Sequence, residues 1–117
     1  MKTYVVWIEM NEAKVFNIKS RGPVVKKFHR HEEGRKNCEK FFHEIAGAIQ
    51  DADEILLMGP SLTKDHFKSH LERHHHQGLA NKVVGMLTLD IQTDPQLMAR
   101  SRKFFKKSDL FDHPINA

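Results

Sequence analysis

Histidine is unusually frequent in this sequence, and its spacing raises the question of metal binding. Among nine histidines, His66, His70 and His74 recur every four residues, and two more follow directly. Residues four apart lie on the same side of a helix, so neighbouring imidazoles can share a metal ion. The glutamate of a His-Glu-x-x-His zinc protease is absent. Surface or partly buried histidines explain the pattern better than a specific zinc site, and an exposed cluster can also bind nickel or zinc incidentally. We therefore expect no metal site, and these three histidines are the candidates if one exists.

Basic residues concentrate in two segments, and their chemistry suits contact with phosphate. One segment runs from His29 to Lys36 and the other from Arg100 to Lys107. Cations on a loop and on one helix face suit a nucleic-acid backbone, and without interleaved aromatic residues base stacking is disfavoured. The candidate RNA-binding residues are Arg30, Arg35, Lys36, Arg100, Arg102, Lys103, Lys106 and Lys107. Exposed lysines and arginines are also ordinary solubility residues, and that alternative stays open.

The overall charge favours an anionic partner. The 117-residue chain has a formal charge of +4 at pH 7 and a pI of about 9.3. This balance favours nucleic acid or the ribosome over a membrane. No apolar run is long enough to cross a membrane. The single cysteine, Cys38, excludes an internal disulfide framework and fits a reducing compartment. We expect a cytoplasmic protein without a cofactor.

Hydrophobic periodicity predicts the elements that position these residues. Apolar runs and alternation predict five strands, near residues 4–9, 13–19, 24–28, 54–58 and 83–89. Apolar residues at three-four spacing predict three helices, near residues 37–50, from 64 to about 75, and from 95 onward. Thr63 and Asp94 are the predicted N-caps of the second and third helices, and Gly47 is expected to let the first approach the sheet closely. The last strand is apolar throughout, which predicts burial on both faces.

The resulting order, β-β-β-α-β-α-β-α, indicates the fold class. A three-strand meander followed by parallel crossovers gives an α/β fold with a mixed sheet and helices packed on it. This is the arrangement of the ribonuclease H-like group of folds. The length predicts a single domain over residues 1–112, with a C-terminal tail at 113–117.

The stretch from Leu57 to Phe67 carries a resemblance to a known family. It reads Leu-Met-Gly-Pro-Ser-Leu-Thr-Lys-Asp-His-Phe, and it resembles a segment of the archaeal and eukaryotic peptide-chain release factors and Pelota. In those proteins a strand ends in Gly-Pro-Gly, and the next helix opens with an aromatic-Thr-Lys-acidic pattern ending in Phe. The element order also resembles their middle domain, which is grouped among the translational machinery components.

Two departures limit the chemistry that this resemblance implies. In release factors a Gly-Gly-Gln loop between the third strand and first helix promotes peptidyl-tRNA hydrolysis. The corresponding connection here, His29 to Lys36, has one glycine and no glutamine, and Ser61 replaces the last glycine of Gly-Pro-Gly. Pelota also lacks Gly-Gly-Gln. The resemblance therefore implies ribosome or RNA association without catalysis.

We thus predict a non-catalytic, translation-related protein that binds the ribosome or structured RNA through a basic surface. Two other hypotheses are a protein-interaction module or homodimer that uses an exposed sheet edge, and a metal-dependent nuclease. The nuclease would use Glu9 and Asp90, because Asp53 and Glu54 lie at the amino end of their strand. A thiol enzyme based on Cys38 is disfavoured, since that residue begins the inward stripe of a helix.

Overall fold

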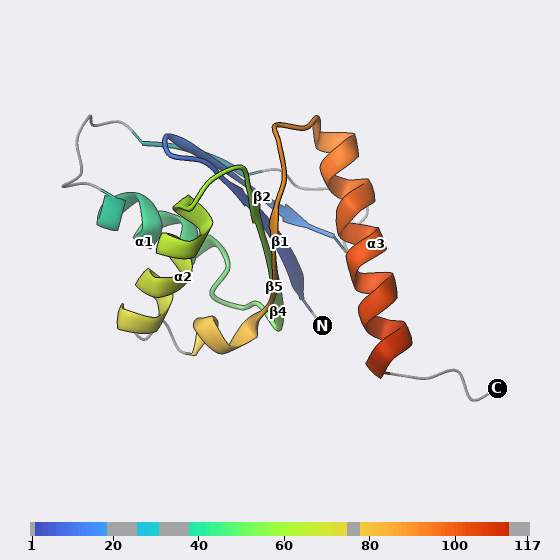
Figure 1. Cartoon of the computed structure of the whole chain (residues 1–117). Coiled ribbons are helices and arrows are strands. Elements are labelled where there is room, and N and C mark those ends of the chain that lie inside the picture. Colours follow the sequence, from blue (N-terminus) through green and yellow to red (C-terminus); the bar gives the residue numbers. More distant parts are fainter. Residues whose placement is uncertain (1, 19–25, 31–37, 75–77, 113–117) are drawn as a thin grey trace.

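The chain forms one five-stranded mixed sheet covered by helices on both faces (Figure 1). The computed structural model describes residues 2–18, 26–30, 38–74 and 78–112, with side chains up to residue 106. Its elements are β1 (Thr3–Ile8), β2 (Glu12–Asn17), β3 (Lys26–His29), α1 (Cys38–Ala48), β4 (Glu54–Gly59), α2 (Thr63–His74), the 3-10 helix η2 (Leu79–Lys82), β5 (Val83–Thr88) and α3 (Asp94–Asp112). The predicted tail, 113–117, lies outside the described residues.

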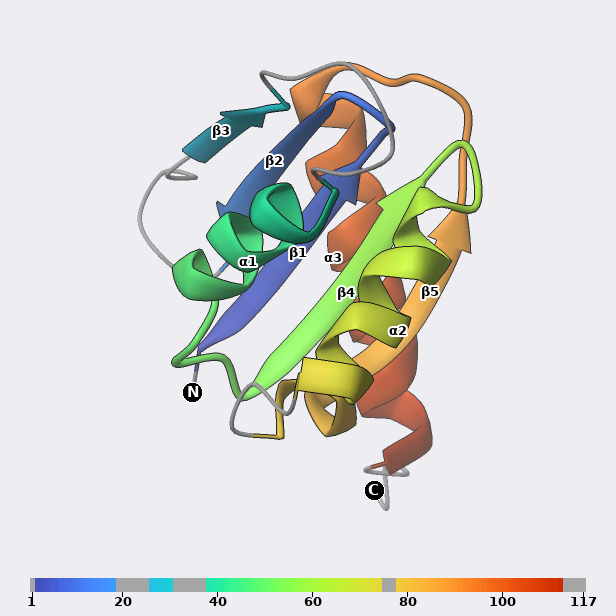
Figure 2. The same ribbon diagram turned by 90° about the vertical axis from the view of Figure 1, so that its left-hand side faces the viewer.

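The sheet order is β3-β2-β1-β4-β5, as Figure 2 shows from the side of α1 and α2. β2 pairs antiparallel with both β1 and β3, which confirms the predicted meander. β4 pairs parallel with both β1 and β5, which confirms the predicted parallel crossovers. The predicted α/β class and element order are therefore those of the structure.

Two apolar clusters hold the layers together, one on each face of the sheet. Successive residues of a strand point to opposite faces, so β1 and β4 contribute to both clusters. On one face, Val6 and Leu57 pack with Ile45 of α1 and Phe67 of α2. On the other face, Val5, Trp7, Leu56 and Met58 pack with Leu97 and Met98 of α3. The continuous apolar runs of β1 (residues 5–8) and β4 (residues 55–58) match this burial on both faces.

β5 differs from its predicted environment. The sequence predicts burial on both faces, but β5 lies at the edge of the sheet and most of its residues are partly exposed. The side chain of Val84 is 43% exposed. A continuous apolar run predicts that both faces of a strand are covered. It does not reveal whether the strand lies at the edge of the sheet, where fewer neighbours cover its side chains.

The turn between β4 and α2 is held by backbone and side-chain contacts within the predicted family motif. The carbonyl of Leu62 accepts hydrogen bonds from two amides of the first helical turn, so the N-cap is Leu62, and the predicted cap, Thr63, is the first helical residue. Lys64 is 3% exposed, and its Nζ donates to the carbonyl oxygen of Ser61 at 2.7 Å. This buried lysine fastens the turn to the first turn of α2.

The N-cap of α3 is Thr93, one residue before the predicted N-cap, Asp94. The Thr93 hydroxyl accepts from the Gln96 amide at 3.3 Å, and the Gln96 side chain accepts from the Thr93 amide at 2.9 Å. This reciprocal pair is a capping box. The predicted cap, Asp94, instead accepts a hydrogen bond from Lys14 of β2 at 2.8 Å. The ion pair fixes the start of α3 against the meander.

Gly59 makes a close backbone contact with a neighbouring strand, whereas Gly47, for which close approach was predicted, does not. No atom lies within 4 Å of the point where a Cβ of Gly47 would stand, so the predicted role of Gly47 in a close approach to the sheet is wrong. A Cβ on Gly59, in contrast, would lie 2.3 Å from the carbonyl oxygen of Ile8. Gly59 is the last residue of β4 and pairs with Thr88, so it belongs to the sheet and does not merely end the strand.

Candidate nucleic-acid interface

α3 presents its cations to solvent while its other side packs on the sheet. Leu97, Met98 and Ser101 are buried, and the Ser101 hydroxyl donates to the Leu97 carbonyl at 2.7 Å. Phe104 and Phe105 are partly buried and pack against the same apolar cluster. The four cations with described side chains are all exposed: Arg100, Arg102, Lys103 and Lys106. Their positions at three-four spacing place them on both flanks of the buried stripe.

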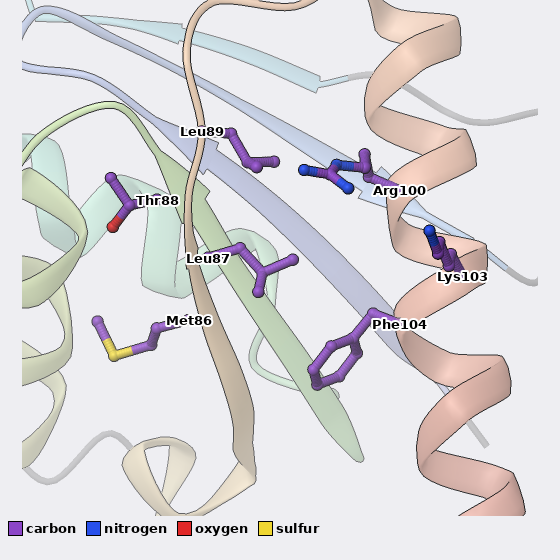
Figure 3. Close-up of a pocket in the computed structure, with 7 residues that line it drawn as sticks. All are labelled: Met86, Leu87, Thr88, Leu89, Arg100, Lys103 and Phe104. Atoms are coloured by element: carbon purple, nitrogen blue, oxygen red, sulfur yellow. The ribbon is translucent and has the colours of Figure 1, made fainter.

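One flank of α3 borders a hollow beside β5 (Figure 3). Its volume is about 350 Å³, and residues 86–89 form its β5 side. Arg100, Lys103 and Phe104 line it from α3. In Figure 3, Arg100 reaches across toward Leu89, while the Phe104 ring lies below Leu87. Arg100 and Lys103 could contact a phosphate here, while the apolar side chains that line the hollow could contact the sugar of the same nucleotide.

These cations have no carboxylate partner among the residues that the structure describes. The ion pairs within the described residues involve Lys2, Lys14, Lys64 and His74 as the basic partner. A cation already paired with a carboxylate gains less from a phosphate, because the existing pair has to be broken. The charge of the α3 face is therefore available to an anionic partner.

The other predicted RNA-binding residues lie elsewhere or outside the described residues. Arg30 follows β3, the strand at the edge opposite to β5, and its backbone amide donates to the carbonyl of Asn11 at 2.8 Å. The predicted Arg35 and Lys36 lie outside the described residues, as does the side chain of Lys107. Arg30 thus follows an edge strand of the sheet, whereas the α3 cations belong to the helix that packs on one of its faces.

A second hollow, of about 450 Å³, lies at the carboxyl ends of β1 and β4, where the nuclease hypothesis places Glu9. Partial burial, together with a hydrogen bond to Glu12, raises the pKa of Glu9, and a hydrogen bond from Trp7 opposes the rise. Asp90 is exposed. Among the described residues, neither Glu9 nor Asp90 belongs to a group of three or more side chains able to hold a metal ion. This geometry gives the nuclease hypothesis no support.

The raised pKa of Glu9 predicts a pH-dependent effect on stability. A carboxyl group with a raised pKa in the folded state costs stability when it ionises, as the pH rises from its ordinary value of 4.5 through the raised value. Glu9→Gln keeps an acceptor oxygen and removes the charge. We expect it to stabilise the protein at pH 7, with the gain disappearing below pH 4.5. Urea unfolding at several pH values measures this. The exposed Glu44→Gln is the control, and a loss of stability in Glu9→Gln at pH 7 would contradict the account.

The structure brings together two of the three candidate metal-binding histidines and adds one that sequence reasoning missed. His70 and His74 lie beside His43 of α1, and the possible ligand atoms of these three are within 4.8 Å of one another. His66 is exposed and outside this group. The four-residue spacing within α2 was visible in the sequence. The approach of α1 to α2 was not, because it depends on how both helices pack on the sheet.

The fold is shared with parts of known translation factors. Pelota from Archaeoglobus fulgidus matches with a TM-score of 0.63 and 13% identity, over 95% of this chain and 37% of Pelota. Dom34 from S. cerevisiae, a translation termination-like factor, matches with a TM-score of 0.57 and 16% identity, over 95% of this chain and 40% of Dom34. The archaeal translation termination factor aRF1 gives 0.59 and 13%, over 93% and 40%.

This chain therefore has the fold of part of Pelota, Dom34 and aRF1. That likeness confirms, at the level of the fold, the resemblance predicted from residues 57–67 and from the element order. The chain spans well under half of the length of each of these proteins. Comparison of the sequence with protein-family models and with curated proteins gives no match. No helix within the described residues has the length and apolarity that crossing a membrane requires.

Proposed function

We propose that this protein acts in translation without catalysis, by binding the ribosome or structured RNA through the exposed basic face of α3. The observation that carries the proposal is the set of four exposed α3 cations without carboxylate partners among the described residues. The fold supplies the context, because the solved structures that share it include two factors of translation termination type. Dom34 is described as acting in RNA quality control and interacting with Hbs1.

The partner is proposed to be recognised through its backbone and shape. Lysine and arginine side chains along one helix face can contact successive phosphates, which carry no sequence information. Structured RNA suits this mode, since its deep, narrow major groove hides the base edges. Arg30, Arg35, Lys36 and Lys107 are proposed to add phosphate contacts at the margins of the same complex.

Co-sedimentation with ribosomal subunits tests the proposal. Each phosphate contact releases counterions, so binding should be strong at low salt and fall steeply as salt rises. We expect the protein to pellet with subunits at about 50 mM salt and to remain in the supernatant at about 500 mM. Absence of binding at low salt, to subunits and to duplex RNA alike, would overturn it. RNA cleavage that is lost in Glu9→Ala would overturn the non-catalytic part.

The homodimer alternative is tested on the same sample. β5 leaves one edge of the sheet unpaired by any described strand, and Val84 on it is 43% exposed. Light scattering after size exclusion should give the 13.6 kDa mass of one chain if the β5 edge does not mediate dimerisation. A mass twice as large would favour the dimer.

A further inference from the structure

Three histidines from two helices meet on the face of the sheet opposite to α3. His43 belongs to α1, and His70 and His74 belong to α2. The ring centroids are 4.5 Å apart for His43 and His70, 5.0 Å for His43 and His74, and 4.3 Å for His70 and His74. Their possible ligand atoms all lie within 4.8 Å of one another. Three imidazoles so close together can converge on a single point between the helices.

Glu39 is a fourth potential metal ligand, and the helical spacing places it beside the three histidines. His70 and His74 are four residues apart, so they lie one turn apart on the same side of α2. Glu39 and His43 have the same spacing on α1, and the Glu39 Oε1 lies 3.7 Å from the Nε2 of His74. Each helix therefore offers two potential ligands to the space between them.

Burial holds one member of the group in place and leaves the others accessible. His70 is 0% exposed, and its ring packs edge-on against Phe42 with centroids 5.4 Å apart. Phe42 in turn packs edge-on against Phe67 in the core. His43 and His74 are exposed. One ligand is thus fixed by the core, and an ion can enter from the solvent side.

We propose that His43, His70 and His74 bind a divalent transition-metal ion, with zinc the first choice and Glu39 or water as the fourth ligand. Imidazole nitrogen is a preferred ligand of zinc, and tetrahedral coordination at about 2.0 Å places the ligand atoms roughly 3.3 Å apart. The present separations need only small rotations of exposed side chains to reach that spacing. The bound ion would join α1 to α2 directly, so its role is structural.

The site is separate from the proposed RNA-binding face. α1 and α2 cover one face of the sheet and α3 covers the other (Figure 1). Loss of metal ligands should therefore leave RNA binding intact, and neutralisation of the α3 cations should leave metal binding intact. Failure of one proposal does not imply failure of the other.

Zinc titration of untagged, EDTA-stripped protein against a chromophoric chelator tests the site. We expect one zinc ion per chain, and the strong visible absorption of four-coordinate cobalt when Co²⁺ replaces zinc. His43→Ala and His74→Ala change exposed residues and should preserve the fold. Each should weaken zinc binding at least about tenfold, since even the loss of a residue supporting a metal ligand costs that much. Zinc should also raise the melting temperature of the native chain, and this rise should shrink in both variants.

His66→Ala is the matched control, because it removes an exposed histidine from the same helix without touching the group. Its zinc affinity should equal that of the native protein. Circular dichroism in EDTA establishes that each variant is folded. Unchanged affinity in both His43→Ala and His74→Ala would overturn the proposal and leave the histidines as packed rings without a metal. Equal weakening in His66→Ala would overturn it too, since the metal would then bind exposed histidines without selection.

Discussion

Replacing Gly59 with alanine should destabilise the protein by at least about 3 kcal/mol, the upper part of the range for overpacking a well-packed core. The new methyl group would lie 2.3 Å from the carbonyl oxygen of Ile8. That oxygen belongs to the backbone of β1, which is paired along its length with both β2 and β4. A flexible side chain could move away, but a paired strand cannot move without lengthening its ladder hydrogen bonds.

Thermal and urea unfolding measure this effect, and the expected fall in melting temperature is roughly 10 °C or more. Gly47→Ala is the matched control. Gly47 lies in α1, is exposed, and has no atom within 4 Å of its missing Cβ. Alanine there should stabilise the protein by up to about 1 kcal/mol, because glycine is a poor helix former. Equal unfolding midpoints for Gly59→Ala and the native chain would show that β1 and β4 do not meet as described.

Neutralising the four exposed cations of α3 should weaken binding to ribosomal subunits or duplex RNA at least about 100-fold at ~50 mM salt, because each phosphate contact adds to affinity at low salt. The variant changes Arg100, Arg102, Lys103 and Lys106 to glutamine. None of these side chains is buried, and none forms an ion pair among the described residues, so the fold should be unaffected. Fluorescence anisotropy with a labelled RNA duplex gives the affinities.

A second variant separates the position of the charge from its amount. It changes four exposed cations outside α3 to glutamine: Lys26, Lys40, Arg73 and Lys82. Each variant lowers the formal charge from +4 to 0. If the α3 face is the binding surface, the second variant should retain most of its affinity. Equal losses in the two variants would mean that overall charge alone, not the α3 face, attracts the RNA.

The sequence predicts those features of the fold that follow from the apolar pattern of a single strand or helix. β1 and β4 contain short continuous apolar runs, and α1 and α3 carry apolar stripes at the helical period, so the predicted type and order of these elements are confirmed. The environment of β5 was predicted wrongly, because pairing at an edge depends on which strands assemble next to it. The caps at Leu62 and Thr93 were each missed by one residue, since Leu62 has no polar side chain to mark it as a cap and Thr93 stands next to another good capping residue, Asp94.

The candidate sites were predictable to different degrees. The exposed cations of α3 follow from helical spacing once Leu97 and Met98 define the buried stripe. The partnership of His43 with His70 and His74 does not follow, because the residues come from different helices and the contact is purely tertiary. The constraint on Gly59 was also hidden, since only the structure reveals the Ile8 carbonyl beside it.

The salt dependence of RNA affinity, compared between the native chain and the α3 variant, tests the central claim most directly. For a phosphate-binding surface, the logarithm of the association constant falls linearly with the logarithm of salt concentration, with a slope of about −0.9 per duplex phosphate contacted. We predict that neutralising the four α3 cations makes this slope shallower by roughly 3.6, about 0.9 for each lost contact. A slope equal to that of the native protein would contradict the proposal that α3 contacts the RNA.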